Sequence, residues 1–267
     1  MRRLIPKLQL KSRMIGSSRR MVLVTTTRFG EVKEIGDPIS QAKIYEDQAA
    51  DELILIDLDA TAESRLIMPE LVERLSSEVC MPLTVGGGVR SIEDFRTLLL
   101  SGADKVAVNT SAFKTPSLIT QAAQIFGEQC VVVSIDYRRS PDGKYQVWTN
   151  AGTNPTGCDP VSFALKCESA GAGEILLTSI DRDGTRQGLD TELTSRIAQR
   201  VSIPVVTSGG CGLASHFVDG FLEGKADGVA AGTYFCFKDE NPMQCRSQIK
   251  NANIPIRLHV ATMTQGY

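Results

Sequence analysis

The chain repeats itself at an interval of about 122–124 residues, and this repeat restricts the folds that it can adopt. Three pairs of segments match: MPLTVGGG (81–88) and IPVVTSGG (203–210), ADKVAVNTSAF (103–113) and ADGVAAGTYFC (226–236), and ADELILIDLDAT (50–61) and GAGEILLTSIDRDGT (171–185). Similarity at a fixed long period indicates structural units built in the same way. We expect one domain over residues 1–257, with halves of about 1–127 and 128–257.

Both halves contain short apolar runs rich in β-branched residues. The eight runs cover residues 4–10, 52–58, 81–87, 105–109, 130–136, 174–180, 203–210 and 227–232. Apolar character on both faces is typical of parallel strands covered by other elements. Segments of helical period such as 91–102 and 116–127 lie between the runs, and Ser91 and Ser117 are placed to cap these two helices. Eight strands alternating with helices predict a (β/α)8 TIM barrel, and the lack of a GxGxxG motif after a strand argues against a Rossmann sheet.

Two long segments exceed what a minimal barrel needs. Residues 11–37 form a basic stretch after the first strand, which we expect to be a long loop, and residues 137–157 have the pattern of a hairpin with a PDG turn. Both follow barrel strands, so we expect both at the carboxyl end of the barrel, where active sites of this fold lie. The tail 258–267 is expected to be disordered.

Composition excludes several classes of function. A net charge of −2 argues against a nucleic-acid partner, and no apolar segment is long enough to span a membrane. Seven scattered cysteines without a CxxC motif indicate reduced thiols and a cytoplasmic protein. With only two histidines, a His-rich metal site is not expected, and no cofactor motif is present.

Glycine-rich segments follow the third and seventh predicted strands, at 86–88 and 208–210. Backbone N–H groups that glycines leave accessible bind phosphate oxygens. Asn109 and Thr110 follow the fourth strand, and Gly232 and Thr233 follow the eighth. The repeat therefore predicts two phosphate sites at one barrel mouth, suited to a ligand phosphorylated at both ends. The alternative is that these glycines only form tight turns.

Acidic residues also end several predicted strands. They are Asp57, Asp59, Asp136, Asp181 and Asp183. Carboxylates at a barrel mouth are candidate general acids or bases, with Asp136 and Asp183 the first choices. The alternative is that they cap helices or form salt bridges in loops.

Charged residues begin four of the strands at the opposite end. They are Arg3, Glu52, Lys105 and Glu174. The residues alone favour a surface salt-bridge cluster that stabilises little, over a gate across an axial passage.

The segments ADELILIDLDAT, PLTVGGGVRSIEDFRTLLLSGADKVAVNT, VVVSIDYRR, PTGCDPV, GAGEILLTSIDRDGTRQGLD and PVVTSGGCG resemble the cyclase subunit of imidazole glycerol phosphate synthase, from histidine biosynthesis. The resemblance covers about residues 2–10 and 37–257. It implies a heterodimer with a glutaminase subunit, whose ammonia passes through the barrel to a substrate with a phosphate at each end. That substrate, a phosphoribulosyl formimino aminoimidazole carboxamide ribotide, yields imidazole glycerol phosphate and an aminoimidazole carboxamide ribotide.

The resemblance also implies roles for particular residues. It favours the gate for the four charged residues, and it places Thr84 along the passage, Asp104 at the glutaminase contact and Asp136 as a catalytic carboxylate. The implied phosphate-binding residues are Gly87, Gly88, Asn109, Thr110, Asp183, Gly184, Ser208, Gly209 and Gly210, with Gly232 and Thr233 beside them.

The sequence departs from the family pattern at the catalytic end. The family's other catalytic aspartate is Gln9 here, and Gln9 is also the repeat counterpart of Asp136. An amide does not titrate near neutral pH and cannot act as a general base. Val24 aligns with a family lysine, and Ala107 and Gly232 align with family serines. Loss of an acid–base group typically lowers the rate by ~10²–10⁴-fold.

Four functions therefore stay open. The chain is a true cyclase subunit, or a repurposed paralogue that delivers ammonia to amidinate a surface-polysaccharide sugar. In the second case, the Arg-rich segment 11–37 either contacts a third acceptor protein or is a solvated loop. A non-catalytic scaffold that activates a glutaminase is the third function. A sugar-phosphate isomerase is the fourth, and Gln9 counts against it as well.

Overall fold

Eight parallel strands close on themselves into a barrel in this computed structural model, which describes residues 1–237 and 241–257. In spatial order they are β1 (Arg3–Ile15), β4 (Leu53–Asp57), β5 (Leu83–Gly86), β6 (Lys105–Val108), β7 (Val131–Arg139), β10 (Glu174–Ser179), β11 (Val205–Ser208) and β12 (Gly228–Ala231). Pairing of β1 with β12 and of β7 with β10 completes the ring. The (β/α)8 barrel is confirmed, and each predicted run overlaps one of these strands. The tail expected to be disordered, 258–267, lies outside the described residues.

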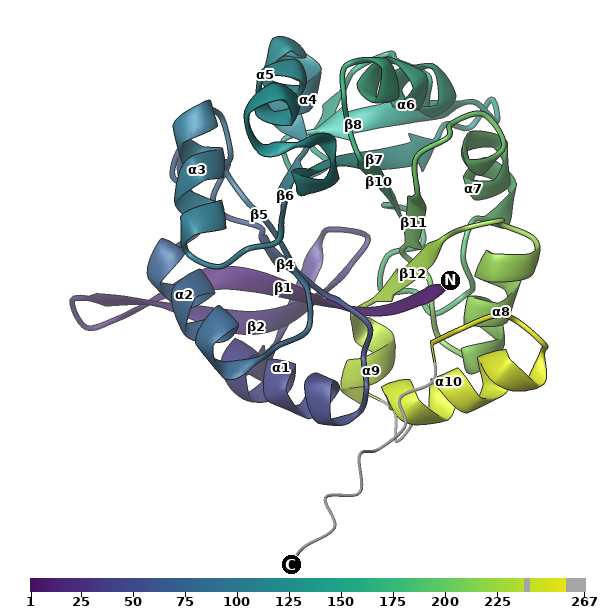
Figure 1. Cartoon of the computed structure of the whole chain (residues 1–267), viewed down its shortest axis with the longest axis horizontal. Coiled ribbons are helices and arrows are strands. Elements are labelled where there is room, and N and C mark those ends of the chain that lie inside the picture. Colours follow the sequence, from purple (N-terminus) through teal and green to yellow (C-terminus); the bar gives the residue numbers. More distant parts are fainter. Residues whose placement is uncertain (238–240, 258–267) are drawn as a thin grey trace, which may run out of the picture.

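Helices surround the barrel, as the ring of ribbons in Figure 1 shows. They are α1 (Pro38–Asp47), α2 (Pro69–Glu78), α3 (Ile92–Leu100), α4 (Thr110–Lys114), α5 (Ser117–Phe126), the 3-10 helix η1 (Glu128–Cys130), α6 (Pro160–Ser169), α7 (Thr191–Ala198), α8 (Ala214–Leu222), α9 (Thr233–Phe237) and α10 (Pro242–Asn251). Among the described residues, no helix combines the length and apolar character that crossing a membrane requires.

Alternation along each strand divides the core into two layers. Outward-facing side chains such as Leu4, Leu8 and Leu10 pack beneath the helices. Inward-facing side chains form a separate buried cluster inside the barrel: Ile5, Ile54, Ala107, Val132, Leu176, Val206 and Ala230. The inner cluster separates the two ends of the barrel.

The segment 11–37 is folded, so the expectation of a long loop is wrong. β1 continues to Ile15, and β2 (Ser18–Thr27) and β3 (Glu31–Gly36) add two antiparallel strands. The run MVLVTTT within β2 is rich in β-branched residues, and Gly16 turns the chain with a φ of 63°. In Figure 1 the β1–β2 ribbon extends beyond the helical ring.

The second long segment is the hairpin that the sequence predicts. β7 continues to Arg139 and pairs with β8 (Tyr145–Thr149), which pairs with the short β9 (Asn154–Pro155). Gly143 in the PDG turn has a φ of 83°. Both long segments therefore extend barrel strands at their carboxyl ends.

The two predicted helix caps have different outcomes. Ser91 caps α3, because its hydroxyl accepts a hydrogen bond from the Asp94 N–H while the Asp94 carboxylate accepts one from the Ser91 N–H. Ser117 is not a cap: Pro116 takes the N-cap position of α5, and Ser117 is the first helical residue. The chain turns directly from α4 into α5, which leaves no extended residue for a serine cap.

This difference predicts unequal effects of two matched substitutions. Ser91→Ala should lower the free energy of the first unfolding transition in urea by about 1 kcal/mol, because a capping hydrogen bond is lost. Ser117→Ala, at another exposed helix start, should change it by less than about 0.5 kcal/mol. Equal losses in both variants would contradict the assignment of the caps.

Candidate active site at the carboxyl ends of the strands

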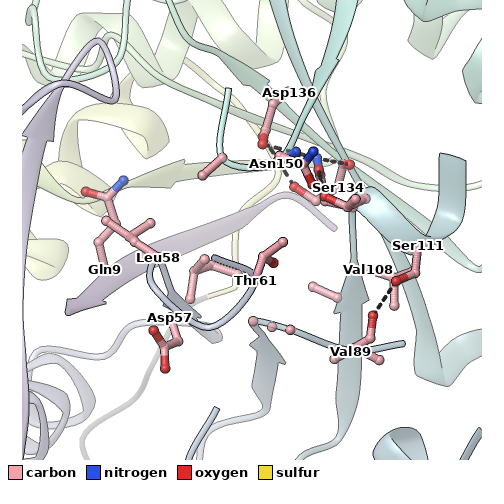
Figure 2. Close-up of a pocket in the computed structure, with 18 of the residues that line it drawn as sticks. Gln9, Asp57, Leu58, Thr61, Val89, Val108, Ser111, Ser134, Asp136 and Asn150 are labelled. Atoms are coloured by element: carbon pink, nitrogen blue, oxygen red, sulfur yellow. Dashed lines mark hydrogen bonds between the residues drawn. The ribbon is translucent and has the colours of Figure 1, made fainter. Parts of the chain in front are cut away.

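A cavity of about 570 Å³ opens at the carboxyl ends of the barrel strands. Its lining includes residues that the sequence singles out: Gln9, Asp57, Gly87, Gly88, Ala107, Asn109, Thr110 and Asp136. Figure 2 shows Gln9 and Asp136 reaching this pocket from different strands. The two long segments also line it, through Phe29 in the β2–β3 turn and Asn150 after β8, so the expectation that they rise at this face is confirmed.

A smaller pocket adjoins the cavity on the side of the second half-barrel. It is lined by Asp183, Gly184, Ser208, Gly209, Gly210, Gly232 and Thr233, which the sequence also singles out. Lys7 and Gln9 line both pockets. The glycine-rich turn of each half thus lines one of the two pockets, and β1 contributes to both.

Close backbone packing by itself requires glycine in both glycine-rich turns. Gly88 has a φ of +71°, and a Cβ there would lie 1.8 Å from the Arg65 carbonyl oxygen. Gly210 has a φ of +115°, and its Cβ would lie 2.1 Å from the Gly188 carbonyl oxygen. Each glycine lets one βα turn pack against a neighbouring loop. Their role in phosphate binding therefore stays a prediction, because packing alone accounts for glycine there.

Asp136 is a buried carboxylate at the larger pocket. Burial is the main cause that raises its pKa to about 6, Lys7 opposes this shift, and Asp183 adds to it. Asn109 Nδ2 donates a hydrogen bond to its Oδ2 at 3.1 Å. A carboxyl group whose pKa lies this close to neutrality is suited to taking up and releasing a proton.

Asp183 is the second buried carboxylate, at the smaller pocket. Burial raises its pKa, while the charge of Lys7 and hydrogen bonds from Thr26 and Gln9 act in the opposite direction. Thr26 Oγ1 donates to Asp183 Oδ2 at 2.6 Å and lies 3.3 Å from Gln9 Oε1. Thr26 comes from β2, so the segment expected to be a loop contributes directly to the site.

The remaining strand-end carboxylates hold loops in place. Asp57 forms an ion pair with Arg65 and accepts the N–H groups of Asp59 and Ala60. Asp59 pairs with Lys11 at 2.7 Å. Asp181 accepts the backbone N–H of Arg139 at 2.8 Å. For these three aspartates, the salt-bridge and loop alternative describes the structure better than an acid–base role.

Two of the four positions at which the sequence was expected to depart from the family pattern, Gln9 and Val24, lie side by side. Gln9 and Val24 are partners across the β1–β2 ladder, and such partners share a face of the sheet. Val24 is 3% exposed, so an apolar side chain occupies the face next to Gln9.

Sequence reasoning missed Lys7 and Thr26 as site residues. Lys7 is 7% exposed. It precedes Gln9 by two residues on β1, so both side chains lie on the same face of the strand, and this spacing is the signal that could have revealed Lys7. Thr26 could not be found in this way, because the fold of β2 was not expected.

The four charged residues at the opposite end form a closed ring, which we call the N-terminal ring. Arg3 Nη1 lies 2.8 Å from Glu52 and 2.9 Å from Glu174. Lys105 Nζ lies 3.2 Å from Glu52 and 3.0 Å from Glu174. Burial by itself would lower the pKa of Arg3, but the charges and hydrogen bonds of the two glutamates outweigh this effect. The pKa of Arg3 is therefore raised above its usual value. The ring side chains are only 7–18% exposed, so this is not an ordinary surface cluster.

Two other predicted residues lie near this end. Thr84 on β5 is 2% exposed and is a register partner of both Ile54 and Lys105, so it shares the inner face of the barrel. Asp104 is exposed next to the ring, and its Oδ2 accepts the Leu83 N–H at 2.7 Å. Within residues 1–237 and 241–257, no group of three or more His, Cys, Asp or Glu side chains is arranged to hold a metal ion.

These features define a (β/α)8-barrel protein in which each half contributes one glycine-rich turn to a shared site. Two features distinguish it: buried carboxylates line the pockets at one end of the barrel, and a closed ring of ion pairs lies at the other. The chain belongs to the family described as histidine biosynthesis protein, whose model matches residues 4–241.

Individual relatives agree with this family. The chain is 48% identical over 257 residues to a Prochlorococcus marinus (strain MIT 9313) protein named "Putative imidazole glycerol phosphate synthase subunit hisF2", covering 96% of this chain and 98% of that one. It is 44% identical over 235 residues to "Imidazole glycerol phosphate synthase subunit HisF" of Alkaliphilus metalliredigens (strain QYMF), covering 88% and 93%. A Methanococcus vannielii protein of the same name is 40% identical over 277 residues, covering 96% and 99%.

Burial of Asp136 predicts a pH-dependent gain in stability on its replacement. Because its pKa is higher in the folded chain than in the unfolded chain, the folded state holds more protons between about pH 4 and pH 6, and stability falls as pH rises through this range. Asp136→Asn should raise the free energy of unfolding at pH 8 by about 2–3 kcal/mol and leave it nearly unchanged at pH 4. Urea unfolding at the two pH values measures this, and an equal effect at both would contradict the raised pKa.

Proposed function

We propose that the chain is the cyclase-type subunit of a glutamine-dependent imidazole glycerol phosphate synthase. It joins ammonia from a glutaminase subunit to the bis-phosphorylated ribotide intermediate, releasing imidazole glycerol phosphate and the aminoimidazole carboxamide ribotide. The observation that carries the proposal is the pair of adjoining pockets, each lined by the glycine-rich turn of one half, that meet at Lys7 and Gln9. Relatives covered almost end to end carry the synthase-subunit name, which supports it.

The two pockets bind the two phosphate groups. In the larger pocket the binding groups are Gly87, Gly88, Asn109 and Thr110. In the smaller pocket they are Asp183, Gly184, Ser208, Gly209, Gly210, Gly232 and Thr233. Glycine turns expose backbone N–H groups, which bind phosphate oxygens without a side chain in the way. The middle of the ligand then lies over β1, next to Asp136.

Asp136 transfers the proton in the reaction. Its pKa of about 6 lets it accept a proton from an attacking nitrogen and return it at neutral pH. Gln9 cannot take the second acid–base role, because its amide neither loses nor gains a proton in this range. Gln9 instead holds Thr26 and Asp183 in one hydrogen-bonded group.

The N-terminal ring is the entrance for ammonia from the glutaminase, which docks beside Asp104. Each ring cation contacts both glutamates, so Lys105 can swing away while Arg3 stays paired with Glu52 and Glu174. One side of the ring can therefore open without leaving a buried carboxylate unpaired, which would be unfavourable. Thr84 then lines the passage above it.

The proposal predicts turnover that depends on the residue at position 9. The wild-type chain should convert the bis-phosphorylated intermediate with added ammonium salt, and Gln9→Asp should raise kcat by about 10²-fold or more through a second carboxylate. Product release is followed by absorbance, with Asp136→Asn as the inactive control. A wild-type chain that neither binds nor converts the intermediate would contradict the proposal.

The two ends of the barrel should respond separately in a glutaminase assay. Lys105→Ala should change the stimulation of the glutaminase, since it breaks two ion pairs of the ring, whereas Asp136→Asn should leave glutaminase docking intact. Lys144→Ala, at the tip of the β7–β8 hairpin, serves as a lysine-removal control because its side chain is 84% exposed. If Lys105→Ala and Lys144→Ala behaved alike, the ring would not be the entrance.

A second candidate is a repurposed subunit that delivers ammonia to another acceptor. The observation that favours it is the replacement of the family aspartate and lysine by Gln9 and Val24, adjacent partners in the β1–β2 ladder. Negligible wild-type turnover that Gln9→Asp restores in part, together with normal glutaminase stimulation, would support this candidate over the cyclase.

A further inference from the structure

Lys7 is a buried cation for which the proposed function has no role. It lies on the inner face of β1, two residues from Gln9, and it lines both pockets. Only 7% of the residue is exposed. Lysine is almost never fully buried unless its charge has partners, so a lysine at this position needs an explanation.

The ammonium of Lys7 has spare hydrogen-bonding capacity. It carries three donors, and among the described residues its one acceptor within 3.5 Å is Thr178 Oγ1, at 3.4 Å. Within the same residues, no carboxylate lies close enough to form an ion pair with it at 4.0 Å or less, although its charge acts on both Asp136 and Asp183. Its remaining donors therefore face the pockets, where ligand oxygens can accept them.

The charges around Lys7 limit what it can bind. Asp136 on β7 and Asp183 after β10 are the carboxylates that its charge influences. The other charged residues lining the larger cavity are Lys11, Asp57, Arg90 and Lys114. Lys11 and Asp57 already have ion-pair partners of their own, and Arg90 and Lys114 are exposed. Lys7 is therefore the buried cation of this cavity, and it shares one pocket with Asp136 and the other with Asp183.

We propose that the Lys7 ammonium is the ligand-binding cation of this site: from its position in the cavity that Asp136 also lines, it donates hydrogen bonds to an oxygen between the two phosphate groups of the ligand. The inference deepens the proposed function and takes the bis-phosphorylated ligand from it. The Lys7 charge also lowers the pKa of the Asp136 carboxyl group, and this effect does not depend on a bound ligand.

The test replaces Lys7 in the full chain and measures two quantities. The first is the titration of the Asp136 carboxyl ¹³C signal without ligand, assigned with Asp136→Asn. The second is the dissociation constant for the histidine-pathway intermediate without ammonia, measured by calorimetry. Lys7→Met keeps the length of the side chain and removes its charge, Lys7→Arg keeps the charge, and Lys144→Met is the control for removal of an exposed lysine.

Lys7→Met should shift the Asp136 titration upward by roughly one pH unit, because the nearby positive charge is lost. It should also weaken binding of the intermediate by about 10- to 100-fold, the usual effect of losing a charged hydrogen bond. Lys7→Arg should keep the Asp136 titration near that of the wild type, and Lys144→Met should change neither quantity.

Two results separate this inference from the proposed function. An unchanged Asp136 titration in folded Lys7→Met overturns the role of Lys7, whatever the chain binds. A wild-type chain that does not bind the intermediate overturns the proposed ligand, while the titration still decides whether Lys7 controls Asp136. A shifted titration with unchanged binding overturns the ligand contact.

Discussion

Closure of the barrel by hydrogen bonds between β1 and β12 and between β7 and β10 is the constraint on which the rest of the structure depends. Once the sheet is closed, every second side chain of each strand must point inward. Along β1 this rule places Arg3 in the N-terminal ring, Ile5 in the inner cluster, and Lys7 and Gln9 at the pockets. One strand therefore connects the two ends of the molecule.

The inner cluster and the site have opposite energetic characters. Residues such as Ile5, Val132 and Leu176 are apolar and fully buried, and they stabilise the barrel. Directly above them lie Asp136 and Asp183, whose raised pKa values show that burial disfavours their charge. Keeping two carboxylates in such a position costs stability, and buried groups of this kind are commonly found at active sites.

Much of the architecture could be predicted because it is repeated and local. The strand runs, the Ser91 cap and the β7–β8 hairpin each follow from a short pattern. The fold of 11–37 was missed, since arginines and serines obscured its alternation and its strands are stabilised by pairing with β1. The misplaced Ser117 cap has a similar cause: the turn after α4, not the serine, sets where α5 begins.

The sequence by itself determined the duplicated barrel, the two glycine-rich turns and the presence of an amide, not a carboxylate, at position 9, because period, turn residues and residue identity are properties of the chain. Only the tertiary structure decided which strand-end aspartates are paired with a cation: Asp57 lines the larger pocket but is bound by Arg65, whereas Asp136 has no cation within ion-pair distance among the described residues. It also brought Thr26 and Lys7 into the site. The physical reason is that hydrogen-bond partners and burial depend on contacts between residues far apart in the chain, which a linear pattern does not contain.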